Sequence, residues 1–204
     1  MMPLRTVALA AVALLAAACA PKRARWDEVR PPEAWLETLP PGASVRVDGA
    51  EAGRAPLSFP VPETAREYAL SLELAGFEVL EVRLPGVRLA GGRLLLVLRP
   101  TGFGSQRRLE ADDPAGLAQA AAALLRADRP REALAFTAAS VEAGDTPLPH
   151  RLAGDAWRQL GDRNRAAQEY SLYLSMAPSA PDRAAVERAI AALRGDIPMP
   201  PPPR

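Results

Sequence analysis

The chain has very few of the residues on which metal, redox and nucleophilic chemistry depend. One cysteine, Cys19, and one histidine, His150, occur among 204 residues. This excludes an internal disulfide and any metal cluster built from several Cys and His ligands. The formal net charge is only +1, so no broad basic face argues for a nucleic-acid partner. No nucleophile stands beside a base, and we therefore expect a non-catalytic protein without metal or cofactor.

The one long apolar run lies at the N-terminus. It extends from Thr6 to Ala18, directly after the cation Arg5, and is shorter than the ~20 residues that a membrane-spanning helix needs. A cation, a short apolar run and small residues are typical of a secretory signal peptide. Leu15-Ala-Ala-Ala-Cys19 resembles a bacterial lipobox, which implies cleavage before Cys19 and attachment of lipid to its thiol. An ordinary Ala-x-Ala cleavage site before Cys19 is the alternative.

The lipobox resemblance also implies a location. In lipoproteins of Gram-negative bacteria, an Asp after the lipidated Cys retains the protein in the inner membrane. Ala20 stands at this position, which implies an outer-membrane anchor facing the periplasm. Residues 1–18 would then be the signal peptide. Residues 19–41, with their paired prolines, are predicted to be the lipidated Cys and a tether, in which residues 32–39 make one or two helical turns.

Residues 42–100 have the pattern of a small all-β domain. The stretch Val45-Arg46-Val47-Asp48-Gly49 is a short strand ending in Asp-Gly, the strongest short signal for a hairpin turn. Residues 68–74 and 80–84 alternate apolar and polar side chains, as strands with one buried face do. Residues 93–99 are apolar on both faces, which favours a central strand. Together these patterns predict a sandwich or barrel.

This region resembles the PEGA domain, a small all-β module of bacterial surface proteins. The resemblance is carried by Val45 to Gly49, Gly53, Ala55-Pro56-Leu57, Tyr68 to Leu72, and Gly76-Phe77-Glu78. Family members usually have Thr or Ser before the Pro-Leu pair and Gly-Tyr in place of Gly-Phe. The resemblance implies an envelope or surface location and no known catalysis.

Helical spacing begins at residue 112, after a linker predicted at 101–111, and continues to residue 194. Apolar residues recur three and four positions apart, in segments separated by Gly, Asp and Pro. Arg131-Glu132-Ala133 and Arg165-Ala166-Ala167 each open the second helix of a pair and start 34 positions apart (165 − 131 = 34). Helical hairpins at this period are typical of tetratricopeptide repeats.

The second helical hairpin resembles a tetratricopeptide repeat closely, and the first does so less closely. The matching residues of the second are Gly154, Trp157, Leu160-Gly161-Asp162, Ala166, Tyr170 and Pro178. In the first hairpin, Ala121, Leu124 and Asp128 replace the small, aromatic and turn residues. A last helix would cap the array, followed by a Pro-rich tail at 195–204. We thus predict an α+β multidomain chain, in which a PEGA-like sandwich precedes an all-α, tetratricopeptide-like array.

The repeat resemblance implies a partner-binding groove lined by the first helix of each hairpin. In the second hairpin the groove-facing positions would be Arg151, Asp155, Arg158 and Gln159, which share one helical face. We expect Arg151 and Arg158 to be exposed. The alternative interpretation of these residues is a solvated polar face.

Two functions follow from these patterns. The first is a lipid-anchored adaptor that binds another envelope protein through the helical repeats, with the membrane contacted through Cys19. The alternative is a cell-wall or surface polysaccharide-binding module that uses the β domain. Polysaccharide sites present aromatic side chains on a rigid face, whereas residues 42–100 contain only Phe59, Tyr68 and Phe77. All three rings can be buried in the core of the domain, which would leave none on the surface for a polysaccharide. This favours the adaptor.

Overall fold

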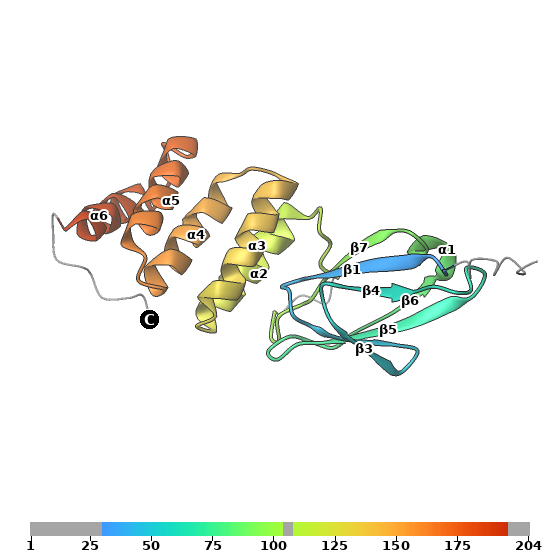
Figure 1. The fold of residues 1–204 in the computed structure, drawn as a ribbon. Helices are drawn as coiled ribbons and strands as arrows, with labels where there is room; N and C mark the ends of the chain where they lie inside the picture. Colours follow the sequence, from blue (N-terminus) through green and yellow to red (C-terminus); the bar gives the residue numbers. More distant parts are fainter. Residues whose placement is uncertain (1–29, 104–107, 196–204) are drawn as a thin grey trace, which may run out of the picture. The chain divides into compact units, whose positions relative to one another are not determined.

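A β domain followed by a helical array makes up the described part of the chain. The computed structural model describes residues 30–103 and 108–195 (Figure 1). The strands are β1 Glu33–Leu39, β2 Ser44–Val47, β3 Ala50–Arg54, β4 Leu57–Pro60, β5 Glu67–Glu73, β6 Leu80–Pro85 and β7 Arg93–Val97. The helices are α1 Gly86–Leu89, α2 Pro114–Arg126, α3 Pro130–Ala143, α4 Pro147–Gln159, α5 Arg163–Met176 and α6 Arg183–Arg194. The predicted α+β class is confirmed. The signal peptide, residues 19–29 of the predicted tether, among them Cys19, and nearly all of the tail lie outside the described residues.

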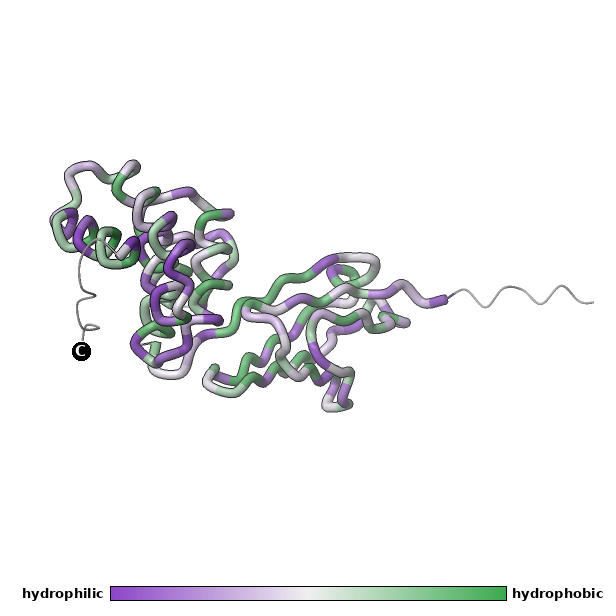
Figure 2. The backbone as a smooth tube through the Cα atoms, turned by 60° about the vertical axis from the view of Figure 1, so that its left-hand side comes forward, coloured by the Kyte–Doolittle hydropathy of each residue, from purple (hydrophilic) through white to green (hydrophobic). Residues whose placement is uncertain are grey.

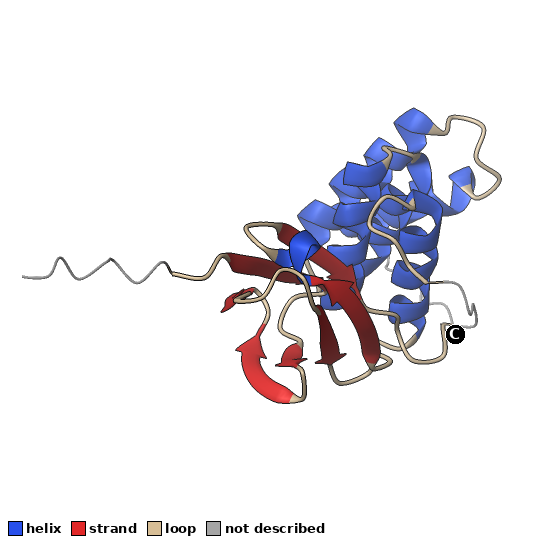
Figure 3. Ribbon diagram, turned by 90° about the vertical axis from the view of Figure 1, so that its right-hand side faces the viewer, coloured by secondary structure: helices blue, strands red, loops and turns tan. Residues whose placement is uncertain are grey.

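The β domain contains two sheets that share one core. The first has the strand order β4-β1-β7, and the second has the order β3-β2-β5-β6. Strand β1 pairs antiparallel with β4 and parallel with β7, whereas all pairs of the second sheet are antiparallel. Both sheets contribute buried side chains to a common apolar cluster, among them Leu36, Phe59, Val45, Leu70 and Leu72. Figure 3 shows these strands in red and the helices in blue.

The Asp-Gly hairpin forms as the sequence predicts. Asp48 and Gly49 both have positive φ, at 50° and 81°, and they join β2 to β3. Two residues with positive φ are what the favoured two-residue hairpin turn requires. The Asp48 carboxylate also accepts hydrogen bonds from the backbone N–H of Ala69 and from Arg66, each at 2.9 Å. The turn is therefore tied to β5, the next strand in the sheet.

The β domain begins earlier than predicted. The sequence indicates a tether with helical turns up to residue 41, but β1 occupies the centre of the three-stranded sheet. Ala34, Leu36 and Thr38 are buried, while Trp35 points outward and is 39% exposed. This alternation is a strand pattern of period two, and the prolines on both sides of the segment obscured it. The folded domain starts near residue 33 rather than 42.

Strand β7 is also placed differently from the prediction. Its apolar composition predicted a central position, but the order β4-β1-β7 puts it at an edge. Leu96 and Val97 are buried, while Leu95 is 45% exposed. Leu96 and Val97 point to opposite faces, so the C-terminal end of β7 is buried on both faces although the strand lies at an edge. Leu95 lies on the outer face of the sheet, on the same side as Trp35.

Phe77 joins the β domain to the helical array. It follows β5 outside the alternating phase, and its ring stacks on Phe136 of α3, with centroids 6.3 Å apart and planes 7° apart. Both side chains belong to one buried cluster that includes residues of both modules. Leu109, within the predicted linker, is buried in the same cluster. The linker therefore packs against the core in its described part, although no helix or strand forms there.

Arg129 reinforces this contact from the α2–α3 turn. Its guanidinium lies 4.7 Å from the centre of the Phe77 ring and donates a hydrogen bond of 2.9 Å to the carbonyl of Ala75. Glycine is favoured at position 76 because φ is +81°, and the absence of a Cβ also lets the Arg129 guanidinium lie directly against this backbone. The Arg129 side chain thus connects the helical array to the backbone of the β5–β6 connection.

The first helices of the two helical hairpins end in the same way. Asp113 caps α2, in the first hairpin, and Asp162 caps α5, in the second, and each accepts a backbone N–H bond of 3.0 Å. Asp128 and Gly161 end the first helix of each hairpin with positive φ, at 55° and 81°, and lie 33 positions apart (161 − 128 = 33). Purple and green alternate along the helices in Figure 2, as expected of helices with one buried face. This region is consistent with a helical repeat array.

A fragment of residues 33–100 should fold to a β structure, whereas a fragment of residues 42–100 should not. The shorter fragment lacks β1, which supplies the pairing partner of both β4 and β7. Circular dichroism and thermal melts would compare the two fragments, and the longer one should melt below the full chain because Phe77 loses Phe136. A cooperative β-type melt for residues 42–100 would show that β1 is dispensable.

Candidate functional site

Helices α4 and α5 approach closely because one position has no side chain. An added Cβ on Gly154 would lie 2.4 Å from two carbons of the Tyr170 ring. Tyr170 and Ala166, both on α5, are buried. The ring of Tyr170 therefore lies directly against the backbone of α4, which brings its hydroxyl to the polar side chains of that helix.

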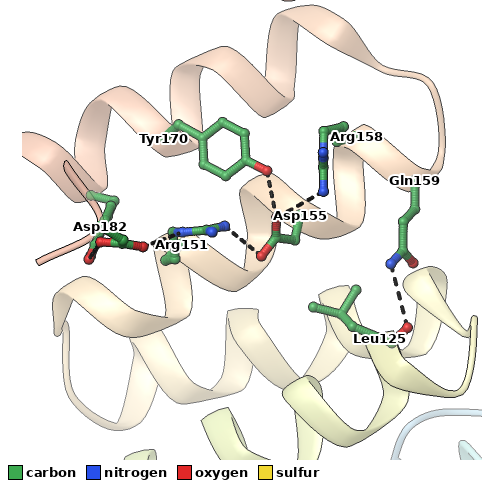
Figure 4. A network of polar contacts seen from close by, with 8 residues as sticks. Leu125, Arg151, Asp155, Arg158, Gln159, Tyr170 and Asp182 are labelled. Carbon is green, nitrogen blue, oxygen red and sulfur yellow. Dashed lines mark hydrogen bonds and ion pairs between the residues drawn. The ribbon is translucent and has the colours of Figure 1, made fainter. Parts of the chain in front are cut away.

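Asp155 is the common acceptor at this point (Figure 4). Its carboxylate accepts hydrogen bonds from the Tyr170 hydroxyl at 2.6 Å and from Arg151 Nη1 at 2.5 Å. Arg158 Nη2 lies 3.6 Å from the same carboxylate. Burial and the neighbouring Asp155 charge raise the pKa of Tyr170, so its hydroxyl remains a donor. One carboxylate thus connects three side chains from two helices.

Arg151 extends the connection to the start of α6. Its Nε donates a hydrogen bond of 3.0 Å to Asp182, the residue before that helix, and Asp182 also accepts one of 2.5 Å from Tyr173. Burial alone would raise the pKa of Asp182, but the hydrogen bonds from Tyr173 and Arg151 outweigh it and lower the pKa. The side chain of Arg151 is only 26% exposed, so the expectation that it is free at the surface is wrong.

A groove of about 540 Å³ runs between α2 and α4. It contains three of the four residues proposed from the sequence, Asp155, Arg158 and Gln159, whereas Arg151 is not among the lining residues. The complete lining is Ala122, Leu125, Arg126, Leu152, Asp155, Arg158 and Gln159. Gln159 also spans the groove, and its amide lies 3.4 Å from the Leu125 carbonyl.

Arg126 is a residue of the groove that the sequence reasoning missed. It is the last residue of α2, its side chain is exposed, and it is 33 positions before Gln159 (159 − 126 = 33). The same offset relates Ala122 to Asp155 and Leu125 to Arg158. Applying the repeat period to the first hairpin would therefore have found this part of the lining.

The groove has more cationic donors than acceptors. Arg126 makes no hydrogen bond or ion pair with the described residues, and Arg158 Nε is buried without a hydrogen-bond partner there. Asp155 already accepts from Arg151 and Tyr170. The Arg158 side chain is only 18% exposed, so its predicted exposure is also wrong. Such guanidinium groups can bind a carboxylate, because Arg forms charge-assisted and often bidentate pairs with it.

His150 forms a second polar cluster, on the opposite side of α4. Its Nδ1 lies 2.8 Å from Glu169 on α5, and its Nε2 lies 2.9 Å from Asp145 in the α3–α4 connection. Ionised carboxylates only accept, so both bonds form together only when both ring nitrogens carry protons. Burial alone would lower the pKa of His150, but the two carboxylates outweigh it and raise the pKa.

An all-β domain and a helical region of this kind fit a surface or interaction module. Residues 33–85 match the PEGA domain family, which confirms the resemblance and places its start at β1. No curated protein and no solved structure matches the chain. Within residues 30–103 and 108–195, none of the helices has both the length and the apolar composition to span a bilayer.

The Gly154→Ala variant should destabilise the protein by about 1–3 kcal/mol, because the new methyl group overpacks the contact with Tyr170. Helix propensity alone predicts the opposite sign, since Ala is favoured over Gly by about 1 kcal/mol inside a helix. Chemical denaturation would measure the change in free energy of unfolding. In a Tyr170→Leu background the penalty should shrink, which a double-mutant cycle quantifies. Stabilisation by Gly154→Ala in the wild-type background would contradict the close approach.

The stability of the helical array should decline as the pH rises above about 6.5, the ordinary His pKa. A raised folded-state pKa makes His150 stabilising below that value, and the contribution is lost as the pH passes through the folded pKa. Denaturation at a series of pH values would measure the effect, with His150→Gln as the variant that cannot titrate. If wild type and His150→Gln have the same pH profile, the two carboxylates do not favour the charged ring.

Proposed function

We propose that this protein is a non-catalytic adaptor of the bacterial cell envelope. In this proposal the helical array is tetratricopeptide-like, and the groove between α2 and α4 binds a carboxylate-bearing segment of another envelope protein. The PEGA domain at residues 33–85 supports a surface or envelope setting. The lipid attached to Cys19 would hold the protein at the outer membrane, facing the periplasm.

The observation that carries the proposal is the unused binding capacity of two arginines in one groove. Arg126 and Arg158 come from the first helices of successive hairpins and line the same groove. Arg158 has a buried Nε without a hydrogen-bond partner in the described part of the chain, and a buried donor that remains unpaired costs about 1–3 kcal/mol. A ligand carboxylate would supply a counter-charge for the Arg126 and Arg158 guanidinium groups. The apolar side chains of Leu125 and Leu152 would cover the neighbouring part of the ligand.

Local equivalence of the hairpins supports the tetratricopeptide-like interpretation. The groove residues of α2 and α4 are related by an offset of 33 positions, and so are the left-handed turns at Asp128 and Gly161. Gly154 packs against Tyr170, as the repeat pattern requires of its small and aromatic positions. Ala166 is fully buried. These contacts involve the residues that carried the sequence resemblance.

The proposed anchor would make the adaptor effective at low partner concentration. A single acyl chain binds membranes reversibly, whereas two or more chains give stable attachment. Attachment through Cys19 would restrict the groove to the membrane surface and raise its effective concentration toward partners located there. The support for this anchor is the sequence pattern alone.

Charge reversal of Arg126 should abolish partner binding and leave the fold intact. Arg126→Glu introduces repulsion toward a ligand carboxylate, and the exposed wild-type side chain makes no hydrogen bond or ion pair with residues 30–103 and 108–195. Arg151→Glu and Arg158→Glu are less suitable variants, because both would also break contacts with Asp155. The matched control is Arg194→Glu, which reverses an exposed charge at the last residue of another helix.

The measurement is chemical crosslinking of the membrane-anchored protein in envelope preparations. A partner recovered with wild type and with Arg194→Glu should be lost with Arg126→Glu, and it should diminish at high salt as the charges are screened. Cys19→Ser should move the protein out of the membrane fraction and reduce the same crosslink. Recovery of the same partner with Arg126→Glu would show that the α2–α4 groove is not the binding site. Retention of Cys19→Ser in the membrane fraction would show that Cys19 does not anchor the protein.

A further inference from the structure

The outer face of the β4-β1-β7 sheet presents an aromatic side chain on a rigid support. Trp35 lies on the central strand, opposite Ser58 of β4 and Arg93 of β7 in the strand register. Glu37, two residues further along β1, pairs with Leu95. Trp35, Arg93 and Leu95 are all substantially exposed. Because the central strand is paired on both sides, the indole stands on the best-supported part of this sheet.

One carboxylate fixes the geometry of this face. Glu37 Oε1 accepts a hydrogen bond of 2.6 Å from the Trp35 indole Nε1 and another of 2.6 Å from Arg93 Nη2. The indole has no other polar atom, so the ring faces are the part of Trp35 left for a ligand. The second Glu37 oxygen has no hydrogen-bond partner among the described residues, and the Arg93 side chain is 79% exposed. An acceptor and several donors thus remain free beside a flat apolar ring.

This combination matches the chemistry of a sugar ring. The electron-rich face of an indole attracts the weakly positive C–H groups on the flat side of a pyranose. The hydroxyl groups at the rim of the pyranose both donate and accept, which suits the adjacent Glu37 oxygen and Arg93 guanidinium. Leu95 would extend the apolar floor beyond Trp35. A pyranose with equatorial substituents offers the flattest face and fits best.

We propose that Trp35, Glu37, Arg93 and Leu95 form a binding site for a neutral glycan chain built of β-1,4-linked pyranose rings. The site lies on the β domain and shares no residue with the α2–α4 groove. An experiment can therefore reject either binding site without affecting the other. It gives the polysaccharide-binding alternative a specific location. Residues 42–100 lack an exposed aromatic side chain of this kind. Trp35 supplies it, because the β domain includes β1 and therefore begins before residue 42.

The charges on this face favour a neutral glycan over an anionic membrane surface. The strand positions on the outer face carry two carboxylates, Glu33 and Glu37, and one guanidinium, Arg93, for a net charge of −1 (1 − 2 = −1). A peripheral membrane site would be expected to carry excess cations. The apolar part, Trp35 and Leu95, is also narrow in comparison with the core of a stable protein interface. A single row of sugar rings needs only such a strip.

Isothermal titration of the full chain would test the site, in a detergent without a sugar headgroup. The probes are cellohexaose and chitohexaose, with a hexamer of galacturonic acid as the anionic comparison. Wild type should bind at least one neutral probe and should bind the anionic one more weakly. Trp35→Ala should weaken neutral binding about tenfold or more, a loss of ~1.4 kcal/mol for each factor of ten. Arg93→Ala should weaken it about threefold or more, whereas Trp35→Phe should retain part of the affinity.

Two controls separate the site from general effects on folding. Leu148→Ala removes an exposed apolar side chain of α4 and should bind like wild type. Thermal melts should show Trp35→Ala and Arg93→Ala folded, because both side chains point outward. The proposal is overturned if wild type binds neither neutral probe, or if folded Trp35→Ala binds them with wild-type affinity. Loss of binding to anionic lipid vesicles in Trp35→Ala, without glycan binding by wild type, would identify a membrane contact instead.

Discussion

The last three helices of the array are joined through the carboxylate of Asp155. This single acceptor holds Tyr170 of α5 and Arg151 of α4, and Arg151 in turn holds Asp182 at the start of α6. The contact is possible because Gly154 leaves room for the Tyr170 ring against the α4 backbone. Loss of the Asp155 carboxylate would leave the partly buried Tyr170 hydroxyl and Arg158 guanidinium without this acceptor, which is costlier than losing an exposed ion pair. The third guanidinium, that of Arg158, is the one whose Nε the network leaves unsatisfied.

The two proposed binding surfaces use opposite physical means. In the α2–α4 groove, guanidinium groups exceed the carboxylates available to them, so the surface favours an anionic ligand segment. On the outer face of the β4-β1-β7 sheet, Glu37 and Arg93 are paired and the charges nearly cancel, so the surface favours a neutral ligand with many hydroxyl groups. Under the two proposals, the β domain binds a neutral glycan chain and the helical array binds a carboxylate-bearing protein segment. The PEGA match at residues 33–85 includes β1, on which the second surface is built.

The modules are coupled through the stacked rings of Phe77 and Phe136 and through Arg129. Gly76 allows Arg129 to approach the β5–β6 connection, and Arg129 also pairs with Glu132 at 2.9 Å. These contacts bury apolar surface from both modules. Removal of either module would therefore expose the phenylalanine ring of the other, Phe77 or Phe136. The boundary between the modules is thus a packed interface rather than a free linker.

The sequence by itself determined the features that depend on a few neighbouring residues. Asp48-Gly49 specifies its hairpin turn, Asp113 and Asp162 cap their helices, and the apolar spacing defines the helical array. The order of β and α modules follows from the same local periods. Only the tertiary structure decided which side chains meet across long separations. Strand β1 forms because it pairs with β4 at residues 57–60 and with β7 at residues 93–97. Arg151 does not line the α2–α4 groove; its side chain instead binds Asp182, 31 residues away. Local periodicity carries no information about such partners, since packing between distant segments selects them.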